Sequence, residues 1–269
     1  RDDVESRGLG DVYKRQVLDN LSIGANISYI YGDITHSVTT AFSNSSSFSS
    51  VRLDKISIND YKLDFGLQYS YKFNKKHVLN FGAVYSLGHS VNGKGYKYNQ
   101  KWLNGADYPS TQTGDTITNA FSLPHTFGAG LTYVYDNRLT IGADFTYQQW
   151  EDAKFYNEKS YFSNRTKIAA GAEFVPNPYS RNYLKRVRYR VGGYYSDPYT
   201  KVDGQDGTRE YGVSAGFGFP LFQSKSILNI SGQYVRVSPK VKGMLEENYL
   251  KINIGLTFNE RWFMKWKVD

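Results

Sequence analysis

The sequence predicts an all-β protein, an antiparallel up-and-down transmembrane β-barrel of about ten strands. Three observations predict this fold class. Apolar and polar residues alternate in ten separate segments, short turns alternate with longer links, and outward aromatic residues gather at both ends of the segments. The chain contains no run of 18 apolar residues, so it offers no candidate for a transmembrane helix.

The alternation is clearest near the end of the chain. From Leu250 to Asn259 an apolar side chain occupies every second position, which places all of them on one face of an extended strand. Nine earlier segments show the same period of two. The ten predicted strands are 21–31, 61–73, 79–87, 127–135, 139–147, 168–174, 187–195, 211–219, 228–234 and 250–258.

The predicted connections differ in length in a regular way. Short turns are expected at 74–76, 136–138 and 223–225. Longer links are expected at 43–50, 99–122 and 197–208. Short periplasmic turns and long outer loops are typical of outer-membrane barrels. Residues 51–73 exceed the length that crosses a bilayer, so the start of this segment is expected to project beyond the outer surface.

Aromatic residues mark both ends of the predicted strands. Five of them lead into short turns or the C-terminus, namely Phe73, Tyr135, Phe174, Phe219 and Phe258. Tyr31, Tyr147 and Tyr195 lie at the opposite ends. Two such rings suit the two membrane–water interfaces. In a soluble barrel the apolar face would point inward, and ten strands would enclose more space than these side chains fill. The apolar face is therefore expected to face lipid.

The composition excludes several classes of function. The chain has no cysteine, which removes disulfides, thiolate metal sites and cysteine nucleophiles. Its net charge is +8, but the basic residues are scattered, so nucleic-acid binding is not expected. The four histidines have no metal-ligand spacing. No catalytic site, metal site or cofactor is therefore expected, and the protein is not predicted to be an enzyme.

The face opposite the apolar one carries ionisable side chains, which we expect to line the lumen. The lumen-lining candidates are Lys62, Asp64, Asp144, Lys167, Glu173, Arg188, Arg190 and Lys251. One interpretation is a ladder of opposite charges that pair across neighbouring strands. The other is a path for a polar substrate. The ladder is favoured, because stability alone explains it.

The first residues differ from the rest of the chain. Asp11–Gln16 resembles a translated sequencing-adapter tail, so residues 1–16 are expected to be a non-native or disordered leader. Residues 17–269 are then expected to form the C-terminal part of an outer-membrane β-barrel.

Three segments carry a family resemblance. Leu123–Tyr133 has a Leu-Pro start and a Gly-rich strand, Leu139–Trp150 has an Ala-Asp strand and a Trp, and Tyr211–Leu221 is Gly-rich again. Together with Val175–Pro178 and Arg188–Tyr195, they resemble the FadL/TodX family of outer-membrane transporters for long-chain fatty acids and aromatic hydrocarbons. The ending Gly255–Phe263 resembles the Bacteroidetes-type members of this family. The resemblance implies a barrel of fourteen strands with an N-terminal hatch, of which this chain would supply the last ten. Leu21–Tyr31 would then have an unpaired edge.

The resemblance also implies a function. We expect an outer-membrane channel for passive uptake of small hydrophobic molecules such as fatty acids, with the C-terminus in the periplasm. The expected partners are outer-membrane lipid, a hydrophobic small-molecule ligand and the outer-membrane assembly machinery, and a monomer is expected. Two alternatives stay open at this stage. One is a general diffusion porin for polar solutes, which the charged lumen suits, and the other is a structural or adhesive surface barrel.

Overall fold

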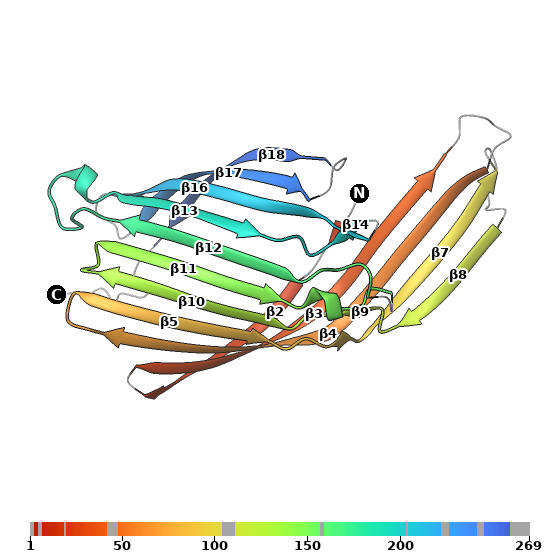
Figure 1. Cartoon of the computed structure of the whole chain (residues 1–269), viewed down its shortest axis with the longest axis horizontal. Coiled ribbons are helices and arrows are strands. Elements are labelled where there is room, and N and C mark those ends of the chain that lie inside the picture. Colours follow the sequence, from red (N-terminus) through yellow and green to blue (C-terminus); the bar gives the residue numbers. More distant parts are fainter. Residues whose placement is uncertain are drawn as a thin grey trace, which may run out of the picture.

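The computed structural model describes residues 3–4, 7–18, 20–41, 48–103, 111–156, 159–202, 204–221, 226–240 and 245–258. These residues form one large antiparallel sheet with a few short additional elements (Figure 1). Within this part of the chain, no helix is both long enough and apolar enough to cross a membrane. The predicted turn at 223–225 lies outside the described residues.

The sheet has a long curled wall, in which each strand pairs with the next one in space. In order, its strands are β2 (Arg7–Leu18), β3 (Leu21–Thr40), β4 (Phe48–Lys72), β5 (His77–Ser86), β10 (Thr126–Tyr135), β11 (Leu139–Gln148), β12 (Arg165–Phe174), β13 (Arg188–Ser196), β16 (Thr208–Pro220), β17 (Ile227–Pro239) and β18 (Glu247–Thr257). Each of the ten predicted strands coincides with part of one of β3 to β18, and four of them extend one residue beyond it. The all-β, antiparallel, up-and-down fold class is therefore confirmed.

Short elements complete the fold. They are β1 (Asp3–Val4), β6 (Ser90–Val91), β9 (Phe121–Ser122), β14 (Lys201–Val202), β15 (Gln205–Asp206) and two single-turn helices, η1 (Trp150–Asp152) and η2 (Tyr183–Lys185). Strand β1 pairs with β3, β6 pairs with β9, and β14 pairs with β15. Strand β1 precedes the wall, the other short elements belong to the connections, and none of them interrupts the wall.

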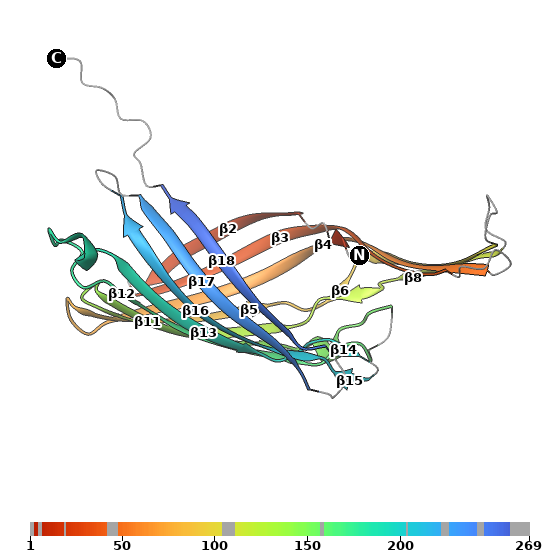
Figure 2. The ribbon, with the colours of Figure 1, turned by 90° about the horizontal axis from the view of Figure 1, so that it is seen from above.

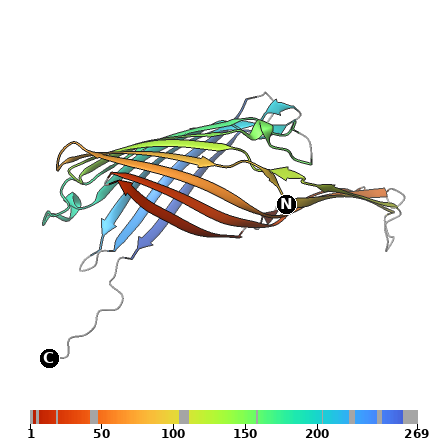
Figure 3. The same cartoon turned by 90° about the horizontal axis from the view of Figure 1, so that it is seen from below.

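The two faces of the wall differ in exposure, as the alternation predicts. Large apolar side chains stand on the outer face, where Val213 is 61% exposed and Ile252 is 69% exposed. Val235, which pairs with Gly212 on the opposite face, is fully buried. A sheet with its apolar face exposed would be unstable in water, whereas lipid covers that face at no cost. The apolar face is therefore the lipid-facing one, and the sheet curls around the polar face (Figures 2 and 3).

One expectation about the edges of the wall is wrong. Leu21–Tyr31 does not have an unpaired edge, because β2 pairs along it from Arg7 opposite Tyr31 to Leu18 opposite Leu21. Among the described strands, β2 and β18 each pair on one side only, so the sheet is curled but not closed. The interpretation of residues 1–16 as a leader stays a prediction.

A flat extension of four strands, which we call the arm, projects past the end of the wall (Figure 1). It consists of residues 32–40 of β3, residues 48–58 of β4, and strands β7 (Gly93–Leu103) and β8 (Thr111–Thr118). The start of segment 51–73 therefore extends past the wall, and its position beyond the outer surface stays a prediction. The predicted link at 99–122 is largely not a loop, because it contains the end of β7 and all of β8.

Strands β3 and β4 pass from the wall into the arm without a break in their pairing. Gly32 is the first residue of β3 beyond its pairing with β2, and its φ of 150° is a conformation that favours glycine. At the root of the arm, Ile56, Ala120 and Tyr156 form a small buried core. This core attaches the arm to the connection between β11 and β12, which supplies Tyr156.

Candidate functional site

The polar face of the wall holds a cluster of charges around Glu173. This carboxylate on β12 accepts hydrogen bonds from two side chains of β13, Arg188 at 3.1 Å and Arg190 at 2.6 Å. Arg190 also donates to the side-chain oxygen of Asn229 on β17, at 2.7 Å. The cluster therefore links three strands of the wall across its polar face.

The other predicted lumen residues lie on the same face but in separate places. Lys62 and Asp64 form an ion pair of 2.6 Å within β4. The ammonium of Lys167 lies 5.2 Å from the ring centre of Tyr194, and that of Lys251 lies 4.9 Å from the ring centre of Tyr249. The structure does not bring the eight candidates into one site. Cross-strand pairing at Glu173 agrees with the charge ladder, and a role in lining a lumen stays a prediction.

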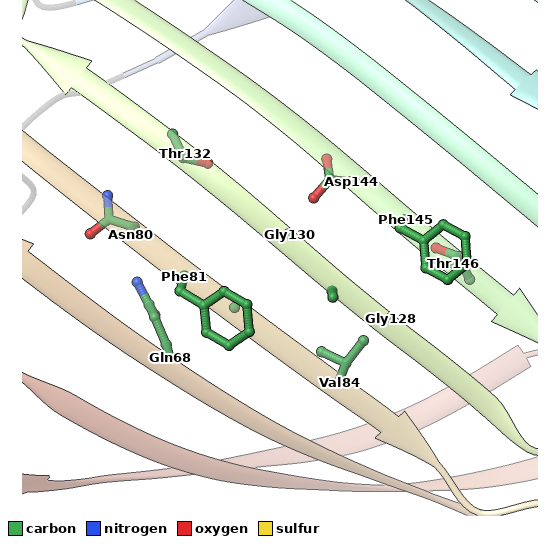
Figure 4. A pocket seen from close by; sticks show the side chains of 12 residues that line it. Gln68, Asn80, Phe81, Val84, Gly128, Gly130, Thr132, Asp144, Phe145 and Thr146 are labelled. Atoms are coloured by element: carbon green, nitrogen blue, oxygen red, sulfur yellow. The ribbon is translucent and has the colours of Figure 1, made fainter.

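Glycine makes part of the wall thin. A hollow of about 360 Å³ lies over β5, β10 and β11, where Gly82, Gly128 and Gly130 carry no side chains (Figure 4). Asp144 points toward Gly130, and a β-carbon at Gly130 would collide with the Asp144 carboxylate. The lining includes Phe81 and Phe145 from the apolar face as well as residues of the polar face. The glycines therefore make the wall thinner at this place, and the hollow does not have the arrangement of side chains that a ligand site needs.

A larger cavity of about 590 Å³ lies at the root of the arm, and we call it the mouth cavity. The arm and the β11–β12 connection form its walls. The lining residues are Ile34, Thr35, His36, Val38, Arg52, Asp54, Lys97, Phe155, Tyr156 and Tyr161. Its volume is in the range of small-molecule sites, and aliphatic and aromatic side chains combined with a few charged groups are typical of such sites.

The charged groups of the mouth cavity are close to one another. Arg52 and Asp54 form an ion pair of 3.2 Å, and the second carboxylate oxygen of Asp54 is buried without a hydrogen-bond partner among the described residues. The ammonium of Lys97 lies 4.6 Å from the ring centre of Tyr156. Burial, together with the nearby Asp54 carboxylate, raises the pKa of Tyr156 to about 12. The cavity thus combines two cations with a buried acceptor.

Aromatic side chains surround the same region, and we call them the mouth aromatic cluster. Its members are Phe121, Trp150, Phe155, Tyr156, Tyr161, Phe162 and Tyr199. The ring centres of Trp150 lie 5.2 Å from Phe162 and 5.3 Å from Tyr199, and those of Phe155 and Tyr156 lie 4.8 Å apart at 84°. These are distances at which aromatic pairs attract one another. The cluster gives the long-loop end of the wall an apolar surface.

Sequence reasoning did not find the mouth cavity. Its residues come from four separate segments, and no local period brings them together. The one signal in the sequence is Trp150, which ends the segment Leu139–Trp150 that resembles the FadL/TodX family. Among the described residues, no group of three or more histidine, cysteine or acidic side chains could hold a metal ion.

Solved structures that resemble this chain include transporters and channels for hydrophobic molecules. The toluene transporter TodX of Pseudomonas putida has a TM-score of 0.58 at 16% identity, covering 93% of this chain and 67% of TodX. A FadL homologue of Pseudomonas aeruginosa has a TM-score of 0.53 at 17% identity, covering 87% of this chain. This chain spans 59% of that homologue's length. The monoaromatic hydrocarbon channel CymD gives 0.55 at 13% identity, covering 88% of this chain and 72% of CymD.

The likeness to these structures confirms the fold expected from the FadL/TodX resemblance. No curated protein sequence matches the chain. The sequence model of one family does, and it covers residues 8–269, which is almost the whole chain. With its lipid-facing apolar surface and FadL-like fold, this outer-membrane β-barrel therefore belongs to the BamG family.

Proposed function

We propose that the protein is a channel for passive uptake of small hydrophobic molecules across the outer membrane. The mouth cavity carries this proposal, because it is an apolar and aromatic recess at the end of the wall where the long connections lie. A dissolved hydrophobic molecule gains free energy when it leaves water for such a surface. The structures similar to this chain include a toluene transporter and a monoaromatic hydrocarbon channel, which supports the same class of substrate.

The charges of the cavity favour a substrate with one polar end. Arg52, which is paired with Asp54, and Lys97 offer cationic donors beside the aliphatic and aromatic lining, and guanidinium and ammonium groups bind carboxylates well. A fatty acid has this chemistry, with an apolar chain and one carboxylate. Toluene lacks the carboxylate, so it would use only the aromatic surface.

The proposed route runs from the mouth cavity along the polar face of the wall. The predicted lumen residues would then line the path, with the cluster at Glu173 near its short-turn end. We also propose that the short-turn end and the C-terminus face the periplasm, and that the protein acts as a monomer. Uptake along this route requires no cofactor, since the substrate moves down its own gradient.

The test is uptake into liposomes that contain the complete gene product. Labelled fatty acid, labelled toluene and a small labelled sugar would be compared at equal concentration. Uptake of the hydrophobic compounds without sugar is expected. Sugar flux at a similar rate would overturn the proposal and leave a diffusion porin, while no flux of any compound would overturn both.

A variant of the mouth cavity sharpens this test. Phe155→Ala removes one aromatic wall, and it is expected to lower fatty-acid uptake roughly twofold to tenfold, since an aromatic contact contributes about 0.5–1.5 kcal/mol. Tyr179→Ala is the matched control, because Tyr179 lies at the other end of the wall and is 94% exposed. Equal loss in both variants would contradict a role for the cavity.

The family match supports a second proposal, association with the outer-membrane assembly machinery. A barrel that associates with this machinery would remain bound to it during gentle purification from the native membrane. Cross-linking in cells, followed by purification of the protein and mass spectrometry, tests this. Recovery of machinery components at near-equal amounts is expected, and their absence would contradict the second proposal without affecting the first.

A further inference from the structure

One connection at the short-turn end of the wall is unlike the others. Strands β4 and β5 are joined by residues 73–76, and β10 and β11 by residues 136–138, whereas β12 and β13 are joined by residues 175–187. This 175–187 loop contains η2 and reaches beyond the neighbouring turns (Figures 1 and 2). A simple reversal of the chain does not need so many residues.

The 175–187 loop has a fixed structure. The backbone amide of Asn177 donates to the carbonyl of Lys185 at 2.8 Å, which closes the loop at its base. The side chain of Asn182 accepts a hydrogen bond from the amide of Leu184 at 3.0 Å and so caps η2. The hydroxyl of Tyr183 donates to the carbonyl of Pro220 at the end of β16, at 3.2 Å. The loop is therefore held against the rim of the wall.

These contacts place η2 beside the lipid-facing surface. The hydroxyl of Tyr189 donates to the carbonyl of Leu184 at 3.1 Å. Tyr189 itself stands on the apolar face, where its ring meets that of Phe217 edge-on with centres 5.8 Å apart. Leu184 is 64% exposed, so its side chain extends the surface that lipid already covers.

Basic side chains accompany this exposed apolar residue. Arg181 and Lys185 are exposed on either side of Leu184, and in the described part of the chain neither makes a salt bridge. The other described turns at this end carry Lys75, Lys76 and Arg138 against one acid, Asp136. The short-turn end is thus basic, and cations that reach the headgroup layer are attracted to anionic lipid.

We propose that the 175–187 loop binds phospholipid in the leaflet at the short-turn end. Leu184 enters the boundary of the acyl chains, and Arg181 and Lys185 bind the phosphates of the headgroups. Continuity with the lipid-covered face favours lipid over a water-soluble partner, because a partner on Leu184 would have to reach into the headgroup layer. The proposal does not depend on transport, and the leaflet is the periplasmic one in the orientation proposed above.

Spin labels test this proposal directly, since the 269-residue chain contains no cysteine. The complete protein would carry Leu184→Cys with a nitroxide, in vesicles of phosphatidylcholine alone or mixed with phosphatidylglycerol. The label is expected to collide often with oxygen and rarely with a water-soluble nickel chelate. Lys75→Cys, in the short turn after β4, is the matched control and should show the reverse.

The charge requirement is tested on the same label. Phosphatidylglycerol is expected to reduce the motion of the label at position 184, and Arg181→Gln with Lys185→Gln should remove that effect while the label stays in lipid. A label as open to nickel as the one at position 75 would overturn the proposal and show that the loop faces water. Immersion with no response to phosphatidylglycerol would overturn phosphate binding.

Discussion

Strands β3 and β4 run through two environments, and the pattern of their side chains changes between them. In the wall, residues 61–71 of β4 alternate strictly, with aromatic and aliphatic residues toward lipid and polar residues on the opposite face. In the arm, Arg52 and Asp54 share a face with Ile56, and Lys55 shares the other with Leu53. Lipid selects one apolar face, whereas water on both sides of the arm requires an apolar surface only at its root. The comparison shows that the surrounding solvent sets the alternation of apolar and polar residues, since the same strand alternates in the wall and not in the arm.

The largest expected effect comes from a charge on the lipid-facing surface of the wall. Val213 lies near the middle of β16 and is 61% exposed. Val213→Lys should destabilise the folded barrel by about 2–4 kcal/mol, because a lysine near the bilayer midplane loses its hydration. Unfolding by urea in lipid vesicles measures this.

The matched substitution in the arm is Val38→Lys, since Val38 is also half exposed at 48%. In water this lysine costs little, and a change within about 0.5 kcal/mol is expected. Equal losses for the two variants would show that both surfaces meet the same solvent, which would contradict the distinction between wall and arm.

The second prediction concerns the root of the arm. Ile56 is 1% exposed in a core of three buried residues. Ile56→Ala should cost about 2 kcal/mol locally, since it leaves a cavity beside Tyr156. Hydrogen exchange should then quicken in β7 and β8, while the amides of β10 and β11 stay protected. Faster exchange throughout the wall would show that the arm and the wall unfold together.

The third prediction concerns the charge ladder on the polar face. Glu173→Gln removes the shared partner of Arg188 and Arg190. Because these groups are partly exposed, the free energy of unfolding should fall by about 1 kcal/mol. If the polar face lines an ion path, the unpaired cations should shift the reversal potential in planar bilayers toward anion selectivity. An unchanged reversal potential would place the ladder outside the path and leave it a purely structural role.

The last prediction concerns the pH response at the root of the arm, which has no effect on stability near neutral pH. Burial raises the pKa of Tyr156 to about 12, above the value near 10 of an unfolded chain. The folded arm therefore holds the neutral phenol, and its contribution to stability is complete below pH 10 and is lost as the pH rises toward 12. Tyr156→Phe should remove this loss, as measured by hydrogen exchange of β7 across that range. The same decline in the variant would assign it to other groups.

The difference between wall and arm also explains how much the sequence could predict. The alternation at Leu250–Phe258 predicts a lipid-facing strand because a single solvent dictates every second position. The same test misses β7 and β8, because polar residues stand on both faces: Lys94 and Gln100 share a face with Tyr96, and Lys97 and Asn99 lie on the other. Local period carries no information about which distant segments meet. The mouth cavity and the pairing of β2 with Leu21–Tyr31 could therefore be found only in three dimensions.

The unbroken pairing of β3 with β4 has a mechanical consequence. Because β3 and β4 are continuous through the wall and the arm, a force on the tip of the arm is transmitted into the wall along their hydrogen bonds. At the junction of wall and arm, the core around Ile56 stiffens β4, whereas Gly32 makes the backbone of β3 easier to bend. A force applied to the arm would therefore bend β3 at Gly32 first. The resulting torque would reach the bilayer through β3 and β4.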